Sequence, residues 1–341
     1  MVIPVFSVII PVYRNEEFVP LLIQECERIA ELVTERFGIA LEVVFVVDAS
    51  PDRSHALLKE ALPKARFRSQ LLLHARNFGS FSAIRTGLQA AKGAYLAVIA
   101  ADLQEPPDLL VGFLEALVDD KYDIVVGVRE QRSDPLAQKI SANLFWQLYR
   151  GLINPQIPRG GVDVFGCNDR IRKELLALRE SNSSLVGLVY WLGFRRTEVS
   201  YARRARAFGK SSWTLSKKIT YLLDSVFAFT DLPVRILSFL GAVGVAAAAV
   251  LGLLVTALRL LGNIEVPGYT PTVLAITFFG GLNTLGLGLV GSYAWRAYEN
   301  TKQRPLALIQ SGLAFAGSAL AGVNPSLEHD TNHANPSSRA M

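Results

Sequence analysis

Cysteine and histidine are scarce in this chain of 341 residues, which contains two cysteines and four histidines. Cys26 and Cys167 cannot build a disulfide framework, and neither these cysteines nor His55 and His74 show metal-ligand spacing. We therefore expect both histidines to be structural or surface residues. A large charge excess is also lacking, because the net charge is only +5. This value argues against nucleic-acid binding, whereas it is compatible with attraction to an anionic membrane surface.

Glycine-rich nucleotide motifs are absent as well. The turn after the first apolar run reads PVYRNEE, without G-x-G-x-x-G, and the chain has no Walker A pattern. Both absences argue against a nicotinamide enzyme or a P-loop enzyme. The first apolar run contains Pro4 and Pro11 and ends at Arg14, so we expect no signal peptide.

Hydrophobic residues, by contrast, are abundant: they make up 50% of the chain, and the mean hydropathy is +0.29. Two runs, 236–258 and 273–294, contain no charged residue. At 1.5 Å per residue the first run would span roughly 34 Å, enough for a bilayer core of about 30 Å. We predict two transmembrane helices here, within 232–298, and the alternative is a pair of buried core helices.

The charges around these runs predict their orientation. The connector, 262–271, contains Glu265 and no Lys or Arg. Basic residues flank the two runs on their other sides: Lys217, Lys218, Arg235, Arg296, Lys302 and Arg304. The positive-inside rule then places both flanks in the cytoplasm and the connector outside, as a helical hairpin. The second run is rich in glycine, which leaves a homo-oligomer packed through these helices open.

Three segments border the hairpin. Residues 213–231 have apolar side chains at helical spacing and a basic start, which fits either a helix lying in the membrane interface or an amphipathic helix on the globular domain. Residues 306–323 are weakly apolar and leave a third span open. We expect 299–341 to be a cytoplasmic tail whose polar end is disordered.

Residues 1–212 are predicted to form an α/β domain. Short continuous apolar runs alternate with amphipathic stretches, and the runs are 6–12, 41–47, 70–74, 94–100 and 123–128. This alternation is typical of a mostly parallel sheet that is covered by helices on both faces.

Polar clusters follow the ends of these apolar runs, where such sheets bind ligands. Tyr13 and Glu16 follow the first run and are suited to holding a base and a ribose, and Asp48 follows the second. Asp102 and Gln104 point the same way in extended chain, so they can share one hard cation such as magnesium. A helix cap is the alternative for each loop acid taken alone.

Read together, the strings PVYRNEE, VVDASPD, RNFGSFSAIRTGLQAAKGAY, AADLQEPP and GVRE resemble the GT-A domain of glycosyltransferase family 2. More narrowly, they resemble its polyprenyl-phosphate glycosyltransferases, the dolichyl-phosphate-mannose-synthase-like branch that includes bacterial undecaprenyl-phosphate glucosyltransferases. The similarity extends over about 5–305 and includes YENTKQRP after the second apolar run. The Q-x-x-R-W signature of the processive synthases is absent.

The resemblance implies roles for individual residues. The residues that match the family's nucleotide-sugar-binding positions are Pro11, Tyr13, Glu16, Val47, Asp48, Ala101 and Asp102. Asp102 and Gln104 match the metal ligands, and Arg129 matches a basic residue near the phosphates. Asp163 lies near the acidic motif of the acceptor site and is our candidate to orient or deprotonate the lipid phosphate. The basic loop that closes over the pyrophosphate corresponds to Arg203, Arg204 and Lys210. The catalytic group is therefore expected to be Asp163, Asp102 and Arg129.

Three departures from the family pattern concern the same residues. Where the family commonly has V-D-D-G-S, this chain has V-V-D-A-S, with Asp48 as the single acid. Where the family commonly has D-A-D, this chain has A-A-D, with Ala100 in place of the first acid. The region around Asp163 reads D-V-F where G-D-F-R is commoner. These differences leave room for an inactive relative.

The implied reaction moves a hexose from a nucleotide diphosphate sugar to polyprenyl phosphate with inversion, assisted by Mg²⁺ or Mn²⁺. UDP-glucose is the favoured donor and GDP-mannose the runner-up. The implied location is the bacterial inner membrane, with several spans and the catalytic domain in the cytoplasm. The alternative is a catalytically silent, membrane-anchored protein that binds a nucleotide sugar or a lipid phosphate.

Overall fold

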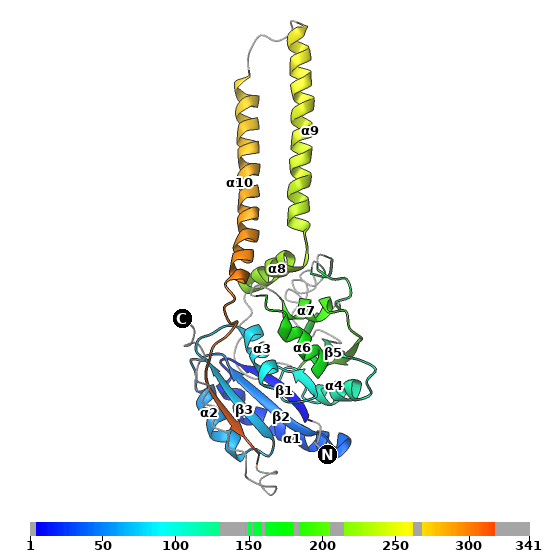
Figure 1. The fold of residues 1–341 in the computed structure, drawn as a ribbon, viewed down its shortest axis with the longest axis vertical. Helices are drawn as coiled ribbons and strands as arrows, with labels where there is room; N and C mark the ends of the chain where they lie inside the picture. Colours follow the sequence, from blue (N-terminus) through cyan, green and yellow to red (C-terminus); the bar gives the residue numbers. More distant parts are fainter. Residues whose placement is uncertain are drawn as a thin grey trace, which may run out of the picture.

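The protein consists of a globular α/β domain from which two long helices extend side by side (Figure 1). This computed structural model describes residues 5–129, 147, 149–151, 153–158, 161–180, 184–204, 215–261 and 268–317. The strands are β1 (Val5–Val12), β2 (Ala40–Val47), β3 (Arg68–His74), β4 (Tyr95–Val98), β5 (Ile124–Arg129), β6 (Val162–Asn168), β7 (Arg196–Tyr201) and β8 (Ile309–Phe315). The helices of the domain are α1 (Val19–Phe37), α2 (Ser54–Ala61), α3 (Ser80–Ala90), α4 (Leu109–Val118), α6 (Asp169–Ala177) and α7 (Leu185–Trp191).

All eight strands form one mixed sheet in the order β7-β5-β6-β4-β1-β2-β3-β8. The pairs β1–β2, β1–β4, β2–β3 and β5–β7 are parallel, whereas β4–β6, β5–β6 and β3–β8 are antiparallel. The prediction of a mostly parallel α/β sheet is therefore confirmed. The predicted series of strands, however, ended at β5 and did not include β6, β7 or β8.

The strands are apolar on both sides because helices cover both faces of the sheet. Alternate residues of β1 point to opposite faces, so that Val8 and Ile10 join one hydrophobic cluster and Ile9 joins the other. The first cluster includes residues of α1, α2 and α4, and the second includes residues of α3, α6 and α7. Burying one large apolar side chain such as that of Phe6, which is 0% exposed, stabilises the fold by roughly 2 kcal/mol.

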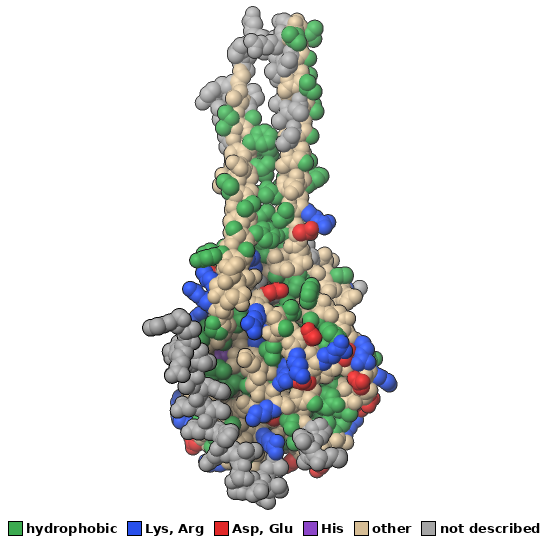
Figure 2. Space-filling model, viewed as in Figure 1, with side chains coloured by type: hydrophobic (Ala, Val, Ile, Leu, Met, Phe, Trp, Pro, Cys, Tyr) green, Lys and Arg blue, Asp and Glu red, His purple; other side chains and the backbone are tan. Residues whose placement is uncertain are grey.

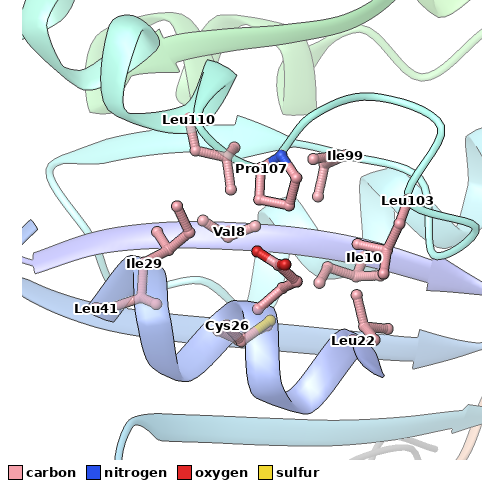
Figure 3. A pocket seen from close by; sticks show the side chains of 12 residues that line it. Val8, Ile10, Leu22, Cys26, Ile29, Leu41, Ile99, Leu103, Pro107 and Leu110 are labelled. Atoms are coloured by element: carbon pink, nitrogen blue, oxygen red, sulfur yellow. The ribbon is translucent and has the colours of Figure 1, made fainter. Parts of the chain in front are cut away.

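The first cluster is closely packed. Figure 3 shows a cavity between α1, the sheet and the segment after β4, lined by side chains such as Ile10, Leu22 and Leu103. Its volume is only about 10 Å³, about the room that a single water molecule needs, and its lining is almost wholly apolar. This cavity is therefore a small packing defect of the core, and we do not consider it a ligand site.

Three further helices follow the globular domain along the chain: α8 (Leu215–Phe229), α9 (Leu232–Leu260) and α10 (Tyr269–Thr301). Figure 1 shows α8 lying across the top of the globular domain and α9 and α10 rising from it. The long helices contact each other where Gly244 faces Phe279 and where Gly286 faces Leu237. The two uncharged runs of the sequence lie within α9 and α10, and most of the segment 213–231 lies in α8.

The surface differs sharply between these parts. On the face shown in Figure 2, Lys, Arg, Asp and Glu side chains gather on the globular domain and at the base of the long helices. Large apolar side chains along α9 and α10 are exposed, among them Phe239 (68%), Leu253 (74%) and Ile276 (68%). Among the described residues, no helix by itself is both long and apolar enough to cross a membrane. Ile219–Phe229 and Leu232–Gly244, bent by 78° from each other, satisfy both criteria as a pair.

The segment after α10 returns to the globular domain. Residues 309–315, for which the sequence left a membrane span open, form β8 and pair antiparallel with β3. The side chain of Phe315 packs against the first hydrophobic cluster. The expected cytoplasmic tail, 299–341, thus contributes an edge strand to the sheet. Residues 318–341 lie outside the described residues.

Candidate active site

The predicted site residues follow strands that end at one edge of the sheet. The parallel strands β1, β2, β3 and β4 place their carboxyl ends there. Since β6 is antiparallel to β4, its first residues lie at the same edge. Arg129 ends β5 opposite Tyr201, which ends β7, so the segment after β7 also begins at this edge. We call this edge the ligand edge.

The loops after β1 and β2 are joined at the ligand edge by Asp52. Its carboxylate accepts hydrogen bonds from the backbone N–H of Glu16 (3.1 Å) and from the hydroxyls of Ser50 (2.6 Å) and Ser54 (2.8 Å). Burial acts to raise the pKa of Asp52, but these hydrogen bonds outweigh it, and the pKa lies below its ordinary value. The Glu16 carboxylate in turn accepts from the backbone N–H of Arg53 at 2.9 Å. Two loops that are distant in sequence are thereby held as one wall.

That wall borders an open cavity of about 300 Å³, lined by Arg14, Glu16, Glu17, Pro51 and Asp52. This volume is at the lower end of the range for small-molecule sites. Tyr13, predicted to hold the base, is 36% exposed and lies next to Arg14, whose guanidinium is 5.5 Å from the Tyr13 ring centroid. Of the residues predicted to hold the base and ribose, Glu16 lines this cavity and Tyr13 is next in sequence to a residue that lines it.

Asp48 is buried and bonded to protein on both carboxylate oxygens. Oδ1 lies 2.8 Å from Nδ1 of His74 and accepts from the N–H of Phe78 (2.8 Å), and Oδ2 accepts from the N–H of Gly79 (2.8 Å). Nε2 of His74 lies 3.0 Å from the Thr86 hydroxyl. Burial acts to raise the pKa of Asp48, but the hydrogen bonds from His74 and the two backbone groups leave it below its ordinary value. The carboxylate thus fixes the turn that starts α3.

The loop after β4 carries the predicted metal ligands. Asp102 is 9% exposed, and its Oδ1 accepts from the N–H of Gln104 at 3.3 Å. Between them, Leu103 adopts a left-handed conformation (φ 52°), which only a tight turn favours in a non-glycine residue. The predicted extended chain at Asp102 and Gln104 is therefore wrong, because a turn separates the two residues; Ala100 occupies the position of the missing acid.

The segment after β7 is bonded to this loop. The Arg203 guanidinium donates to Oε1 of Gln104 at 2.7 Å, and the N–H of Arg204 donates to the Gln104 carbonyl at 2.8 Å. The buried carboxylate of Glu105, which is 1% exposed, lies 3.8 Å from Nε of Arg203. Two of the three predicted basic-loop residues therefore lie beside the predicted metal ligands.

The remaining predicted residues are placed as follows. Pro11 and Val47 lie in β1 and β2, and Val47 is 0% exposed. Ala101 is also buried, at 3% exposed. Asp163 is in β6 at the ligand edge, although its side chain lies outside the described part of the structure. Lys210 lies wholly outside it.

The sequence reasoning missed two residues of this region, Asp52 and Glu105. Asp52 stands inside the quoted string VVDASPD, between Ser50 and Ser54, and that spacing of short polar side chains is a recognisable turn signal. Glu105 directly follows Gln104, and nothing in its local sequence distinguishes a buried acid from a surface acid.

The oxygen atoms of Asp102 and Gln104 are of the kind that bind a divalent cation whose other ligands come from a substrate and water. Among the described residues, no three His, Cys, Asp or Glu side chains are grouped so as to hold a metal. One carboxylate, from Asp102, and one amide oxygen, from Gln104, are nevertheless hard oxygen ligands. Magnesium commonly takes one or two carboxylates and completes its shell with phosphate oxygens and water.

Comparison with known proteins agrees with this geometry. Residues 7–178, which include most of the ligand edge, match the family model described as glycosyl transferase family 2. The chain belongs to glycosyltransferase family 2. It is thus a glycosyltransferase, and its mixed, mostly parallel sheet is the GT-A-like fold that the resemblance to this family implied.

Relatives match nearly the whole chain. An uncharacterized glycosyltransferase of Bacillus subtilis, YkcC, is 29% identical over 92% of this chain and 96% of its own length. The undecaprenyl-phosphate 4-deoxy-4-formamido-L-arabinose transferase of Yersinia enterocolitica is 30% identical over 89% of this chain and 92% of its own length. Among solved structures, glucosyl-3-phosphoglycerate synthase of Mycobacterium tuberculosis with Mn²⁺ and UDP-glucose is similar, with a TM-score of 0.46, 15% identity and coverage of 66% of this chain and 77% of that chain.

Proposed function

We propose that this glycosyltransferase moves a hexose from a nucleotide diphosphate sugar, with UDP-glucose as the favoured donor, to a polyprenyl phosphate held in a membrane. The observation that carries the proposal is the position of the ligand edge, which lies on the side of the domain from which the long helices extend. The N–H of Ala75, just after β3, donates to the carbonyl of Leu308, in the segment that returns from α10. Phe81, in the first turn of α3, contacts Tyr221 of α8, with ring centroids 5.7 Å apart. A related enzyme is named for transfer to undecaprenyl phosphate.

The apolar helices give such an acceptor a place next to the site. We propose that α9 and α10 form a hairpin in the bacterial inner membrane, with the globular domain in the cytoplasm. Their uncharged runs and exposed apolar side chains support this placement. A polyprenyl chain cannot leave the bilayer, so the enzyme must bring its donor site to the headgroup. A hairpin that ends at the ligand edge meets that requirement.

In the proposed reaction, an oxygen of the acceptor phosphate attacks the anomeric carbon, and the bond from that carbon to the donor diphosphate breaks. The nucleoside diphosphate leaves, and the configuration at the anomeric carbon is inverted. The wall formed by Glu16 and Asp52 would hold the nucleoside, and Arg203, Arg204 and Arg129 would supply positive charge where charge develops on the diphosphate. A phosphate acceptor is already ionised near pH 7, so positioning contributes more than proton transfer.

Asp102 and Gln104 would hold Mg²⁺ or Mn²⁺. When bound, the cation would neutralise charge on the leaving diphosphate. Gln104 Oε1 accepts from Arg203 in the structure, and its second lone pair leaves room for a cation. Asp163, at the start of β6, is the proposed group that orients the acceptor phosphate.

The test is transfer of radiolabelled sugar into undecaprenyl phosphate by the full-length protein in phospholipid vesicles. UDP-glucose and GDP-mannose serve as donors, with Mg²⁺ or with EDTA. We expect transfer by the wild type, at least 100-fold less after Asp102→Asn, and a similar loss with EDTA. Asp119→Asn, which changes an exposed acid after α4, is the control and should retain activity. Wild-type activity that survives both EDTA and Asp102→Asn would refute the metal assignment, and no transfer from any donor would favour the silent binding protein.

A further inference from the structure

The helix α8 lies between the globular domain and the long helices α9 and α10 (Figure 1). A cluster of hydroxyl groups holds its position against the globular domain. The hydroxyl of Tyr221, in α8, lies 2.5 Å from Oγ of Ser184 and 3.4 Å from the hydroxyl of Tyr149. The Tyr149 hydroxyl also lies within hydrogen-bond distance of Oγ of Ser184 (3.0 Å) and of Oγ of Ser225 (3.1 Å), and it can donate its single proton to one of them. We call these four residues the hydroxyl cluster.

Three of the four residues of the hydroxyl cluster are buried, which makes its geometry specific. Tyr149, Ser184 and Ser225 are all 0% exposed. A buried hydroxyl without a partner costs about 1–3 kcal/mol, so any shift of α8 that breaks these bonds is penalised. The rings of Tyr149 and Tyr221 also stack, with centroids 5.6 Å apart and planes 5° apart. Three segments that are far apart in sequence therefore meet in one arrangement.

A second contact fixes the end of α8. A Cβ atom added to Gly187, in α7, would lie 2.3 Å from Cε2 of Phe229, the last residue of α8. Glycine at this position thus lets the Phe229 ring lie directly on the backbone of α7. The side of α8 that faces α7 is fixed at both Tyr221 and Phe229, while Ile219 and Leu223 are 51% and 49% exposed.

Tyr221 connects this arrangement to the donor side of the site. Its ring contacts Phe81 in the first turn of α3, with centroids 5.7 Å apart. That turn begins at Gly79, whose N–H donates to the buried carboxylate of Asp48. Tyr221 thus touches the helix whose start is fixed at the ligand edge.

On its other side, α8 is tied to α10. Asp224 accepts a hydrogen bond from the Arg296 guanidinium at 2.7 Å, and both side chains are partly buried (34% and 21% exposed). The same guanidinium lies 4.9 Å from the ring centroid of Phe227. The long helices cannot tilt relative to the globular domain without disturbing α8.

We propose that Tyr221 is a positioning residue for the lipid acceptor: through the hydroxyl cluster and Phe81, it sets the height of the ligand edge relative to the membrane. This inference rests on the proposed transfer to polyprenyl phosphate. In this proposal Tyr221 acts through the elements it contacts and not by contact with the donor or the reacting atoms. Its loss should impair an acceptor whose position is fixed by the bilayer and spare an acceptor that reaches the site from water.

The test therefore compares two acceptors for the full-length protein in phospholipid vesicles: undecaprenyl phosphate in the bilayer and geranyl phosphate in solution. The donor is UDP-glucose or GDP-mannose, whichever the wild type uses. We expect Tyr221→Ala to lower kcat/KM for undecaprenyl phosphate at least tenfold and to change kcat/KM for geranyl phosphate less than twofold. The donor KM should stay within twofold of wild type. Tyr221→Phe, which keeps the ring contacts and removes the hydroxyl, should give a smaller loss of the same kind, and Thr220→Ala, at the exposed neighbouring position, should give none.

Other outcomes overturn the inference. An equal loss with both acceptors would make Tyr221 merely structural, and an unchanged undecaprenyl phosphate reaction in Tyr221→Ala would show that it has no positioning role. If Tyr221→Ala does not fold, Tyr221→Phe decides by the same comparison. A wild-type protein that binds donor but transfers to neither acceptor would refute the proposed function itself. A wild type that transfers, together with a Tyr221 variant that behaves like it, would refute only the role of Tyr221.

Discussion

At the scale of single residues, the ligand edge depends on carboxylates that accept hydrogen bonds from the backbone. Asp48 bonds the turn before α3, and Asp52 bonds the loops after β1 and β2. In both residues the hydrogen bonds outweigh the effect of burial, and the pKa lies below its ordinary value. Ionised carboxylates that accept several hydrogen bonds keep their loops in one conformation, which preorganises the site before the donor binds.

Asp48→Asn should destabilise the fold by about 3 kcal/mol at pH 7, because an amide turns a donor group toward the N–H donors of Phe78 and Gly79. Since the folded pKa of Asp48 is depressed, its contribution is fully present above the unfolded value of about 3.9 and is lost as the pH falls through the folded pKa. Thermal unfolding between pH 7 and pH 3 measures this. The difference in Tm between wild type and Asp48→Asn should be largest near pH 7 and shrink below about pH 4; a constant difference would contradict the assignment.

Asp52→Ala should weaken donor binding more than it weakens the fold. Removing this carboxylate breaks its bonds to the Glu16 N–H and to the serine hydroxyls and so loosens the contact between the loops after β1 and β2, which line the cavity of about 300 Å³. We expect the donor KM to rise at least fivefold while kcat falls by less than a factor of three. Steady-state kinetics with varied donor measures the change, and Glu60→Ala, an exposed acid in α2, is the control. An unchanged donor KM would show that the wall does not bind the donor.

At the scale of elements, β8 is the least expected component of the sheet. It follows both long helices in the sequence, yet it pairs with β3. All of its residues except Phe315 are exposed. Its sequence, IQSGLAF, is neither strongly apolar nor alternating, so local patterns do not predict a strand. The same strand covers the edge of β3, which would otherwise present unpaired backbone groups to solvent.

Removal of β8 should therefore destabilise the globular domain. A chain that stops after Pro305 loses every ladder hydrogen bond between β3 and β8, together with the packing of Phe315. A chain that stops after Gly317 keeps the strand and serves as the reference. We expect the shorter chain to have a Tm lower by roughly 5 °C or more and to aggregate faster, measured by thermal unfolding and light scattering in detergent. Equal Tm values for the two chains would show that β8 contributes nothing to stability.

At the scale of the whole molecule, α8 lies between the sheet and the pair of long helices and connects the two parts (Figure 1). The charged residues seen in Figure 2 lie on the globular domain and at the base of this pair. Such a separation of charged from apolar surface is expected of a protein that has one part in water and another in a lipid bilayer, as proposed above. The proposed orientation follows from the basic residues at the base of the helices.

Cysteine labelling tests this orientation in intact bacterial cells. The native cysteines, Cys26 and Cys167, are 8% and 0% exposed, so the background reaction should be low. Glu265→Cys, in the connector between the long helices, should react with a membrane-impermeant maleimide added outside the cells. Arg304→Cys, after α10, should react only after the cells are opened. Labelling of Arg304→Cys from outside, without Glu265→Cys, would place the globular domain on the opposite side of the membrane.

The sequence by itself determined the alternation of strands and helices in the first half of the chain, because buried parallel strands must be continuously apolar and their covering helices amphipathic. It also determined that Tyr13, Asp48, Asp102 and Arg129 gather at one edge, because parallel strands end together. The sequence also contained the two uncharged runs that lie in α9 and α10, and a run of this length without charge predicts a helix with an apolar surface.

Only the tertiary structure decided which groups meet across long sequence distances. No local sequence pattern indicates these contacts. Examples are the pairing of β3 with β8, the bond of Asp52 to the loop after β1, and the contact of Arg203 with Gln104. The hydroxyl cluster around Tyr221 likewise joins three segments, and the sequence of none of them predicts contact with the other two. Such contacts depend on where the packed sheet and helices bring side chains together, and that placement is set by the burial of the whole core rather than by any one stretch of the chain.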